Sequence, residues 1–146
     1  MASCVLDTNI LLYLANTAAS EHGPAKASVS RMLAAGDRLA IAAQVLFEFW
    51  SVATRPVSAN GLGWTGPQAR AAIDGFRGRF AILAEPPEVI DLWLELVETH
   101  DLKGKRVHDA HLLATMKANG VAQLVTLNVA GFPADPAFAN IAPTFA

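Results

Sequence analysis

The stretch VLDTNILL, residues 5–12, places a single carboxylate, Asp7, between two apolar runs. A carboxylate inside a continuous hydrophobic core would be buried without compensation, so Asp7 must lie at the junction of two elements. We expect a short strand over Cys4–Leu6 and a helix from about Thr8 to Thr17. Asp7 is then either the N-cap of that helix or the edge of a functional site, because aspartate suits both positions.

Length and composition narrow the class of protein. A chain of 146 residues with 53% hydrophobic and 16% charged residues predicts one compact domain over residues 1–146. The lone Cys4 excludes an intramolecular disulfide and is compatible with a reducing cytosol. The net charge of -2 gives no overall attraction to nucleic acid, although a local basic patch can suffice. No apolar run approaches the roughly 20 residues of a membrane helix. We therefore expect a soluble cytoplasmic protein without a membrane partner.

Short apolar segments alternate with amphipathic ones along the rest of the chain. Strands separated by helices pair in parallel through right-handed crossovers, which predicts an α/β fold. We expect a three-layer α/β/α sandwich around a central, mostly parallel sheet of four to five strands. Ligands bind such sheets beyond the carboxyl ends of the strands, where Asp7 is expected. The expected strands cover residues 4–6, 38–43, 80–83 and 122–127 and the region around 141, and the later helices cover 24–35, 44–55, 67–79, 88–100 and 107–120, with loops at 57–66 and 101–106.

Three further polar residues share the unusual context of Asp7. Glu48 interrupts the most apolar helix, Asp109 lies near the start of a later helix, and Asn128 follows a strand as Asp7 does. Clustered carboxylates repel one another and are costly to desolvate unless a cation neutralises them. A hard divalent ion with oxygen ligands, Mg²⁺ or Mn²⁺, would do so and would support phosphoryl chemistry.

Each of these residues also has a structural role open to it. Asp7 can be only a helix cap, and Glu48 can face solvent. Asp109 near a helix start is favoured by the helix dipole, and Asn128 is a common turn residue. Only their joint occurrence favours a site over four independent structural roles.

The histidines and the basic loop allow other interpretations. His108 and His111 are three residues apart with His100 upstream, but a zinc site usually needs three or four nitrogen or sulfur ligands. We expect His111 to face solvent or a neighbouring helix. The loop Lys103–Arg106 is a candidate phosphate-contacting surface, and Arg106 lies one helical turn before Asp109.

Taken in chain order, four segments resemble the PIN domain, and in particular the VapC-type toxin ribonucleases of bacterial toxin–antitoxin pairs. They are LDTNILL at residues 6–12, the apolar helix around Glu48, RVHDAHLLATMKANG at residues 106–120, and LVTLN at residues 124–128. The resemblance covers nearly the whole chain. It implies a PIN-like fold with the acidic site at the carboxyl edge of the sheet.

The resemblance also implies roles for individual residues. Asp7, Glu48, Asp109 and Asn128 would be the catalytic residues, with Asp7 and Asp109 as the direct ligands of Mg²⁺ or Mn²⁺. The supporting or substrate-binding residues would be Thr8, Asn9, Arg106 and Thr126.

The chain departs from the family pattern after its last clear strand. PIN domains commonly carry acidic residues in this segment, whereas this chain has Asn128 and Gly131. An amide oxygen can coordinate a metal or orient a water but adds no negative charge. The departure predicts weaker metal affinity, or one metal ion in place of two.

We therefore expect a metal-dependent endoribonuclease, the toxin of a VapBC-type pair, that cleaves RNA phosphodiester bonds with a metal-activated water. The resemblance implies an RNA substrate, a VapB-like antitoxin and a homodimer as partners. The alternative is a catalytically weakened PIN-type module that binds RNA or protein. A phosphotransferase of the haloacid-dehalogenase kind would need a second aspartate where this chain has Asn9.

Overall fold

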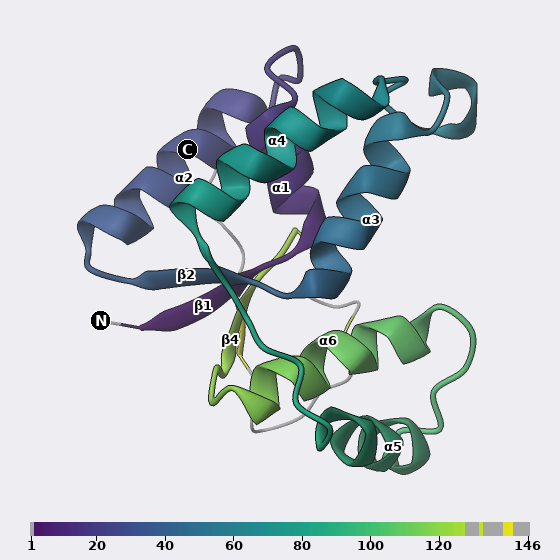
Figure 1. Ribbon diagram of the computed structural model, residues 1–146. Coiled ribbons are helices and arrows are strands. Elements are labelled where there is room, and N and C mark those ends of the chain that lie inside the picture. Colours follow the sequence, from purple (N-terminus) through teal and green to yellow (C-terminus); the bar gives the residue numbers. More distant parts are fainter. Residues whose placement is uncertain (1, 128–131, 133–138, 142–146) are drawn as a thin grey trace.

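A parallel sheet of five strands forms the middle layer of the computed structural model, which describes residues 2–127, 132 and 139–141 (Figure 1). The spatial order of the strands is β3-β2-β1-β4-β5, and every neighbouring pair is parallel. The predicted fold class is confirmed. The strands are β1 (Ser3–Leu6), β2 (Arg38–Ile41), β3 (Ala81–Ile82), β4 (Gln123–Val125) and β5 (Ala139–Ile141).

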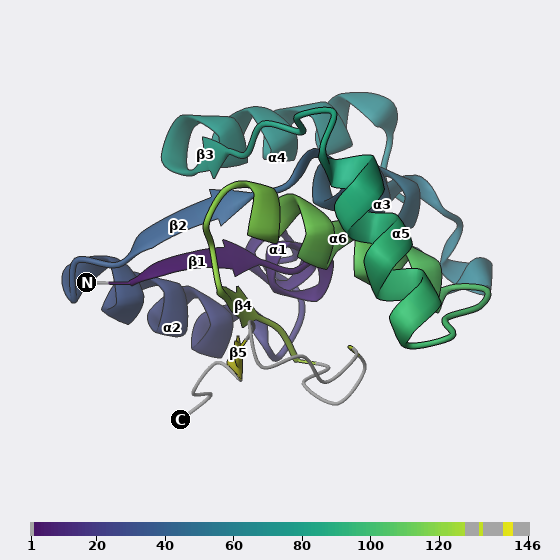
Figure 2. The same ribbon diagram turned by 90° about the horizontal axis from the view of Figure 1, so that it is seen from below.

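Helices cover both faces of this sheet. Figure 1 shows the first four helices gathered on one side of the sheet and the last two on the other, and Figure 2 shows the last two from below. Among the described helices, none combines the length and the apolar character that crossing a membrane requires. The helices are α1 (Thr8–Ala15), α2 (His22–Ala34), α3 (Ala43–Thr54), α4 (Gly66–Arg79), α5 (Val89–Thr99) and α6 (Arg106–Ala118).

Helices α2 to α6 each begin one or two residues from the expected start, as α4 and α6 illustrate. The segment expected to be a loop at residues 57–66 contains a 3₁₀ turn, η1 (Val57–Ala59), and ends in the first residue of α4. Thr65 caps α4 with a capping box, in which its hydroxyl accepts from Gln68 N and the Gln68 side chain accepts from Thr65 N. Helix α6 begins at Arg106, so this residue lies in the first turn and not in the preceding loop.

The core explains why the central strands are so apolar. Strands β1 and β4 are covered by helices on both faces, and Val5, Leu6 and Leu124 are fully buried. On the side of α3 and α4, the buried Phe49 ring makes edge-to-face contacts with Phe76 at 5.2 Å and Trp64 at 6.3 Å between ring centroids. This packing fixes α3, which carries Glu48, against α4.

Candidate active site

Asp7 lies where β1 ends and α1 begins, in the centre of the sheet. Its backbone N–H donates to Val125 O at 3.0 Å, which ties it to the neighbouring strand β4. Its Oδ1 accepts from Thr8 N at 2.8 Å, so Asp7 is the N-cap of α1. Its Oδ2 accepts from Thr126 Oγ1 at 2.7 Å. Asp7 therefore occupies both of the positions expected for it, a helix cap and the carboxyl edge of the sheet.

Glu48 reaches the same edge from α3. Thr8 Oγ1 donates to Glu48 Oε2 at 2.7 Å, and Gln44 Nε2 donates to Glu48 Oε1 at 2.8 Å. The same Gln44 nitrogen donates to His108 O at 2.9 Å, in the first turn of α6. Glu48 is thus half-buried and points toward α1, and the structure does not support its solvent-facing alternative.

Asp109 approaches from the first turn of α6. Burial raises the pKa of Asp109, the negative charges of Asp7 and Glu48 raise it further, and the positive charge of Arg106 opposes them. Burial likewise raises the pKa of Asp7, against hydrogen bonds from Thr126 and Thr8 that lower it, and the charge of Glu48 adds to the increase. The charge of Glu48 raises the pKa of both Asp7 and Asp109, and the charge of Asp7 raises that of Asp109, so the three carboxylates lie near a common region.

The expected supporting residues surround this region. Asn9 Nδ2 donates to Thr126 Oγ1 at 3.4 Å, and Asn9 Oδ1 accepts from Leu127 N at 3.3 Å. Arg106 is exposed at the rim, one helical turn from Asp109, as its sequence spacing predicted. Asn128 and Gly131 lie outside the described residues, so the departure from the family pattern stays a sequence observation.

The donor set suits a hard cation better than a soft one. Within the described ranges, no three side chains of His, Cys, Asp or Glu form a group that could hold a metal ion, and this includes the histidines of α6. Mg²⁺, however, is usually held by one or two carboxylates and completes its shell with water and substrate phosphates. Asp7 and Asp109 are carboxylates whose repulsion a divalent cation would relieve. The residues present therefore fit Mg²⁺ or Mn²⁺.

Gln44 is a site residue that sequence reasoning missed. Two acceptors, the Glu48 carboxylate and the His108 carbonyl, flank its side-chain nitrogen, which fixes the orientation of the amide. Its Oε1 is buried and has no hydrogen-bond partner among the residues that the structure describes. The available signal was its position four residues before Glu48, on the same face of a helix.

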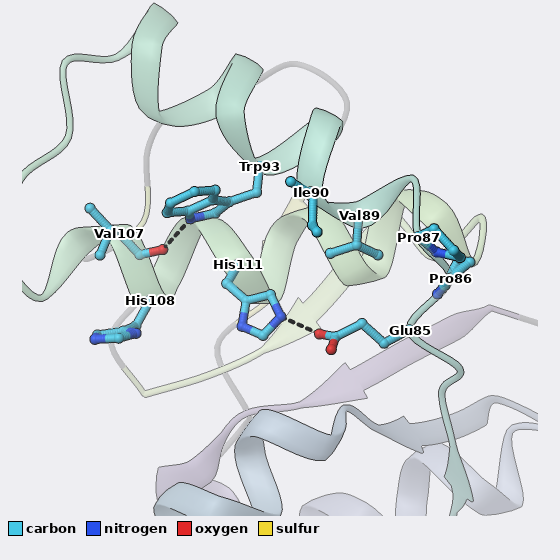
Figure 3. A pocket seen from close by; sticks show the side chains of 9 residues that line it. All are labelled: Glu85, Pro86, Pro87, Val89, Ile90, Trp93, Val107, His108 and His111. Carbon is cyan, nitrogen blue, oxygen red and sulfur yellow. Dashed lines mark hydrogen bonds and ion pairs between the residues drawn. The ribbon is translucent and has the colours of Figure 1, made fainter.

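A separate pocket of about 300 Å³ lies between α5, α6 and the segment that follows β3 (Figure 3). His111 forms a hydrogen bond with Glu85 across one end of it, so its partner is the segment after β3, whereas it was expected to face solvent or a neighbouring helix. Trp93 Nε1 donates to Val107 O at 2.8 Å. Sequence reasoning did not single out Glu85. The lining residues are Glu85, Pro86, Pro87, Val89, Ile90, Trp93, Val107, His108 and His111.

At the level of sequence, both a family model and a curated protein match this chain. The family model of the PIN domain matches residues 4–132. Ribonuclease VapC24 of Mycobacterium tuberculosis is 33% identical to this chain over an alignment of 135 residues, and the match covers 87% of each protein.

Solved structures share the fold at lower sequence identity. VapBC2 from Rickettsia felis, solved bound to a DNA fragment from its promoter, has a TM-score of 0.72 and 20% identity, and covers 96% of this chain and 98% of its own. VapC20 of Mycobacterium tuberculosis, a sarcin-ricin loop cleaving toxin, has a TM-score of 0.58 and 21% identity, and the match covers 83% of this chain and 86% of that one. With the family model spanning most of its length and a ribonuclease relative matching across it, the chain belongs to the PIN domain family.

Proposed function

We propose that this protein is a metal-dependent endoribonuclease and the toxin of a VapBC-type toxin–antitoxin pair. The observation that carries the proposal is that three carboxylates lie near one edge of the sheet. Asp7 caps α1, Glu48 lies on α3, and Asp109 lies in the first turn of α6. The similarity to Ribonuclease VapC24 supports RNA as the substrate. It also disfavours the alternative of an inactive binding module.

The chain's own residues divide the work of phosphodiester hydrolysis. Asp7 and Asp109 would hold Mg²⁺ or Mn²⁺, which stabilises charge on phosphate oxygens and lowers the pKa of bound water. Both oxygens of Glu48 accept hydrogen bonds, which fixes the carboxylate so that it can orient an attacking water or accept its proton. The exposed Arg106 at the rim is placed to contact a phosphate of the RNA backbone.

The test is cleavage of end-labelled RNA by the purified chain with Mg²⁺, Mn²⁺ or EDTA. We expect Asp7→Asn and Asp109→Asn to lose cleavage and EDTA to abolish it in the parent protein. The matched control is Asp74→Asn, because Asp74 is exposed on α4 and, among the described residues, pairs with the neighbouring Arg70 alone. Circular dichroism verifies that each variant is folded.

Two outcomes would contradict the proposal. Cleavage by Asp7→Asn and Asp109→Asn at the parental rate would remove the carboxylates from the mechanism. Calorimetry that detects no Mg²⁺ or Mn²⁺ binding at millimolar concentration would remove the metal.

We also propose a homodimer and a VapB-like antitoxin as partners. The VapBC2 structure supports the antitoxin, since it is a relative of the same fold in a toxin–antitoxin assembly. Large apolar side chains on the surface support an interface, with Phe47 72% and Ile90 64% exposed. Sedimentation velocity tests the dimer, and co-expression with the product of the adjacent upstream reading frame tests the antitoxin. A cytoplasmic location stays a prediction.

A further inference from the structure

We propose that the pocket between α5 and α6 is a nucleobase subsite, which holds one base of the substrate RNA beside the carboxylates and selects guanine through Glu85. This inference rests on the proposed ribonuclease function. The pocket is separate from the carboxylate site, since none of the three carboxylates lines it. Binding of a base there would influence which RNA sequence is cut.

The lining of the pocket suits a flat heterocycle. The rings of Pro86, Pro87 and Trp93 and the side chains of Ile90 and Val107 form its apolar walls. The hydrogen bond from Trp93 to Val107 O holds the indole in place before any ligand enters. A volume of about 300 Å³ is at the lower end of the range for ligand pockets, which suits one base and not a larger ligand. Single-stranded RNA is recognised by bases stacked against such side chains and read at their edges.

The polar end of the pocket offers hydrogen-bond acceptors. Glu85 Oε1 bonds with His111 Nε2 and accepts from Thr115 Oγ1 at 3.4 Å, which orients the carboxylate. Glu85 Oε2 has no partner among the described residues, so it can accept from a ligand. Guanine is the one RNA base with two adjacent donors, N1–H and N2–H, on its Watson–Crick edge. An ionised carboxylate is an acceptor without donors, and it therefore matches guanine better than the other bases.

The pocket adjoins the carboxylate site through His108. This residue lines the pocket, and its backbone carbonyl accepts from the same Gln44 nitrogen that donates to Glu48. The next residue on α6 is Asp109. A base in the pocket would therefore belong to the same RNA strand whose phosphate the carboxylates hold.

Nucleotide binding to the metal-free, full-length protein tests the subsite without any cleavage. The NMR signals followed are the indole N–H of Trp93, assigned with Trp93→Phe, and the imidazole of His111. We expect guanosine 5′-monophosphate to shift both signals saturably and uridine 5′-monophosphate to shift them much less. Because the two nucleotides share a phosphate, the difference reports the base.

Variants of Glu85 test the selecting residue. Glu85→Gln should weaken guanosine monophosphate binding by about five-fold or more, which corresponds to the roughly 1 kcal/mol that one hydrogen bond contributes. Glu98→Gln, an exposed carboxylate of α5 that does not line the pocket, should bind like the parent. Mapping of cut sites in RNA of random sequence should show guanine enriched at one fixed position beside the cut, and Glu85→Gln should redistribute the cuts among the four bases.

The possible failures are distinguishable. If the parent protein cuts no RNA, the proposed function fails, and nucleotide binding still tests the pocket. If RNA is cut but neither nucleotide shifts the pocket signals and Glu85→Gln leaves the cut sites unchanged, the subsite is overturned and the ribonuclease stands. If the signals respond to protein concentration and not to nucleotide, a second copy of the chain occupies the pocket, and the subsite is likewise overturned.

Discussion

Replacing Thr126 with valine should reveal how strongly the fold holds the Asp7 carboxylate. Thr126 is 0% exposed, and its hydroxyl donates to Asp7 Oδ2 at 2.7 Å. Valine retains the branched shape and removes the hydroxyl. A hydrogen bond to a charged group contributes about 1.5–3 kcal/mol, so the free energy of unfolding should fall by roughly that amount at neutral pH.

The loss should depend on pH, because the hydrogen bond favours the ionised form of Asp7. Burial already raises the pKa of Asp7 above its unfolded value, so ionisation of Asp7 destabilises the fold. The fold therefore has its full stability, as far as Asp7 is concerned, below the unfolded pKa of Asp7, where the carboxyl is protonated in both states. That stability is lost as the pH rises through the folded pKa. Without Thr126 the folded pKa rises further, and the loss at neutral pH grows. At acid pH the valine variant lacks only a hydrogen bond between neutral groups, and its free energy of unfolding should be lower by about 0.5–1.5 kcal/mol.

The assay is urea unfolding of the parent protein and Thr126→Val at a series of pH values. We expect the difference in unfolding free energy to increase from acid to neutral pH. The control is the same substitution in an Asp7→Asn background, where no carboxylate titrates and the difference should be flat. A difference that is constant with pH in both backgrounds would refute the hydrogen bond as the link between Thr126 and Asp7.

Further substitutions test the site and the packing. Asp109→Asn should raise the unfolding free energy at neutral pH and not at acid pH, because burial and the neighbouring negative charges raise the pKa of Asp109; urea unfolding at two pH values measures this. Gly75→Ala should stabilise the protein by up to about 1 kcal/mol, since Gly75 lies inside α4 with nothing within 4 Å of the added Cβ; thermal melting checks it. Gly61→Ala should lower the melting temperature strongly, because its Cβ would lie 1.9 Å from Arg55 O. Phe49→Ala should cost about 3–5 kcal/mol in urea unfolding, as expected for a fully buried aromatic ring.

The sequence was sufficient for the features that depend on local pattern. The pattern of residues 5–12 is typical of a strand, a capping aspartate and an apolar helix, and the structure confirms each. Asp7 lies at the carboxyl edge of the sheet because it directly follows β1, whereas Glu48 and Asp109 reach this edge from α3 and from the first turn of α6. The start of α6 at Arg106 and of α4 at Gly66 differ by one residue from the expected bounds, which is the usual uncertainty of helix ends.

The features that the sequence did not predict depend on contacts between distant segments. Gln44 meets the carbonyl of His108 only because α3 and α6 are brought to one edge of the sheet. Glu85 meets His111 only because the segment after β3 passes beside α6. Neither pair has a periodic signal in the chain, since each partner satisfies an ordinary helical or loop pattern by itself.

The amide of Gln44 connects helices from the two outer layers of the sandwich. Its nitrogen holds Glu48 of α3 with one bond and the first turn of α6 with the other. A protein that binds the outer surface of α5 and α6 and displaces α6 would therefore loosen Glu48 without touching it. Such an enzyme can therefore be inhibited without any group blocking its active site. Displacement of α6, which carries Asp109, would disturb the positions of both Asp109 and Glu48.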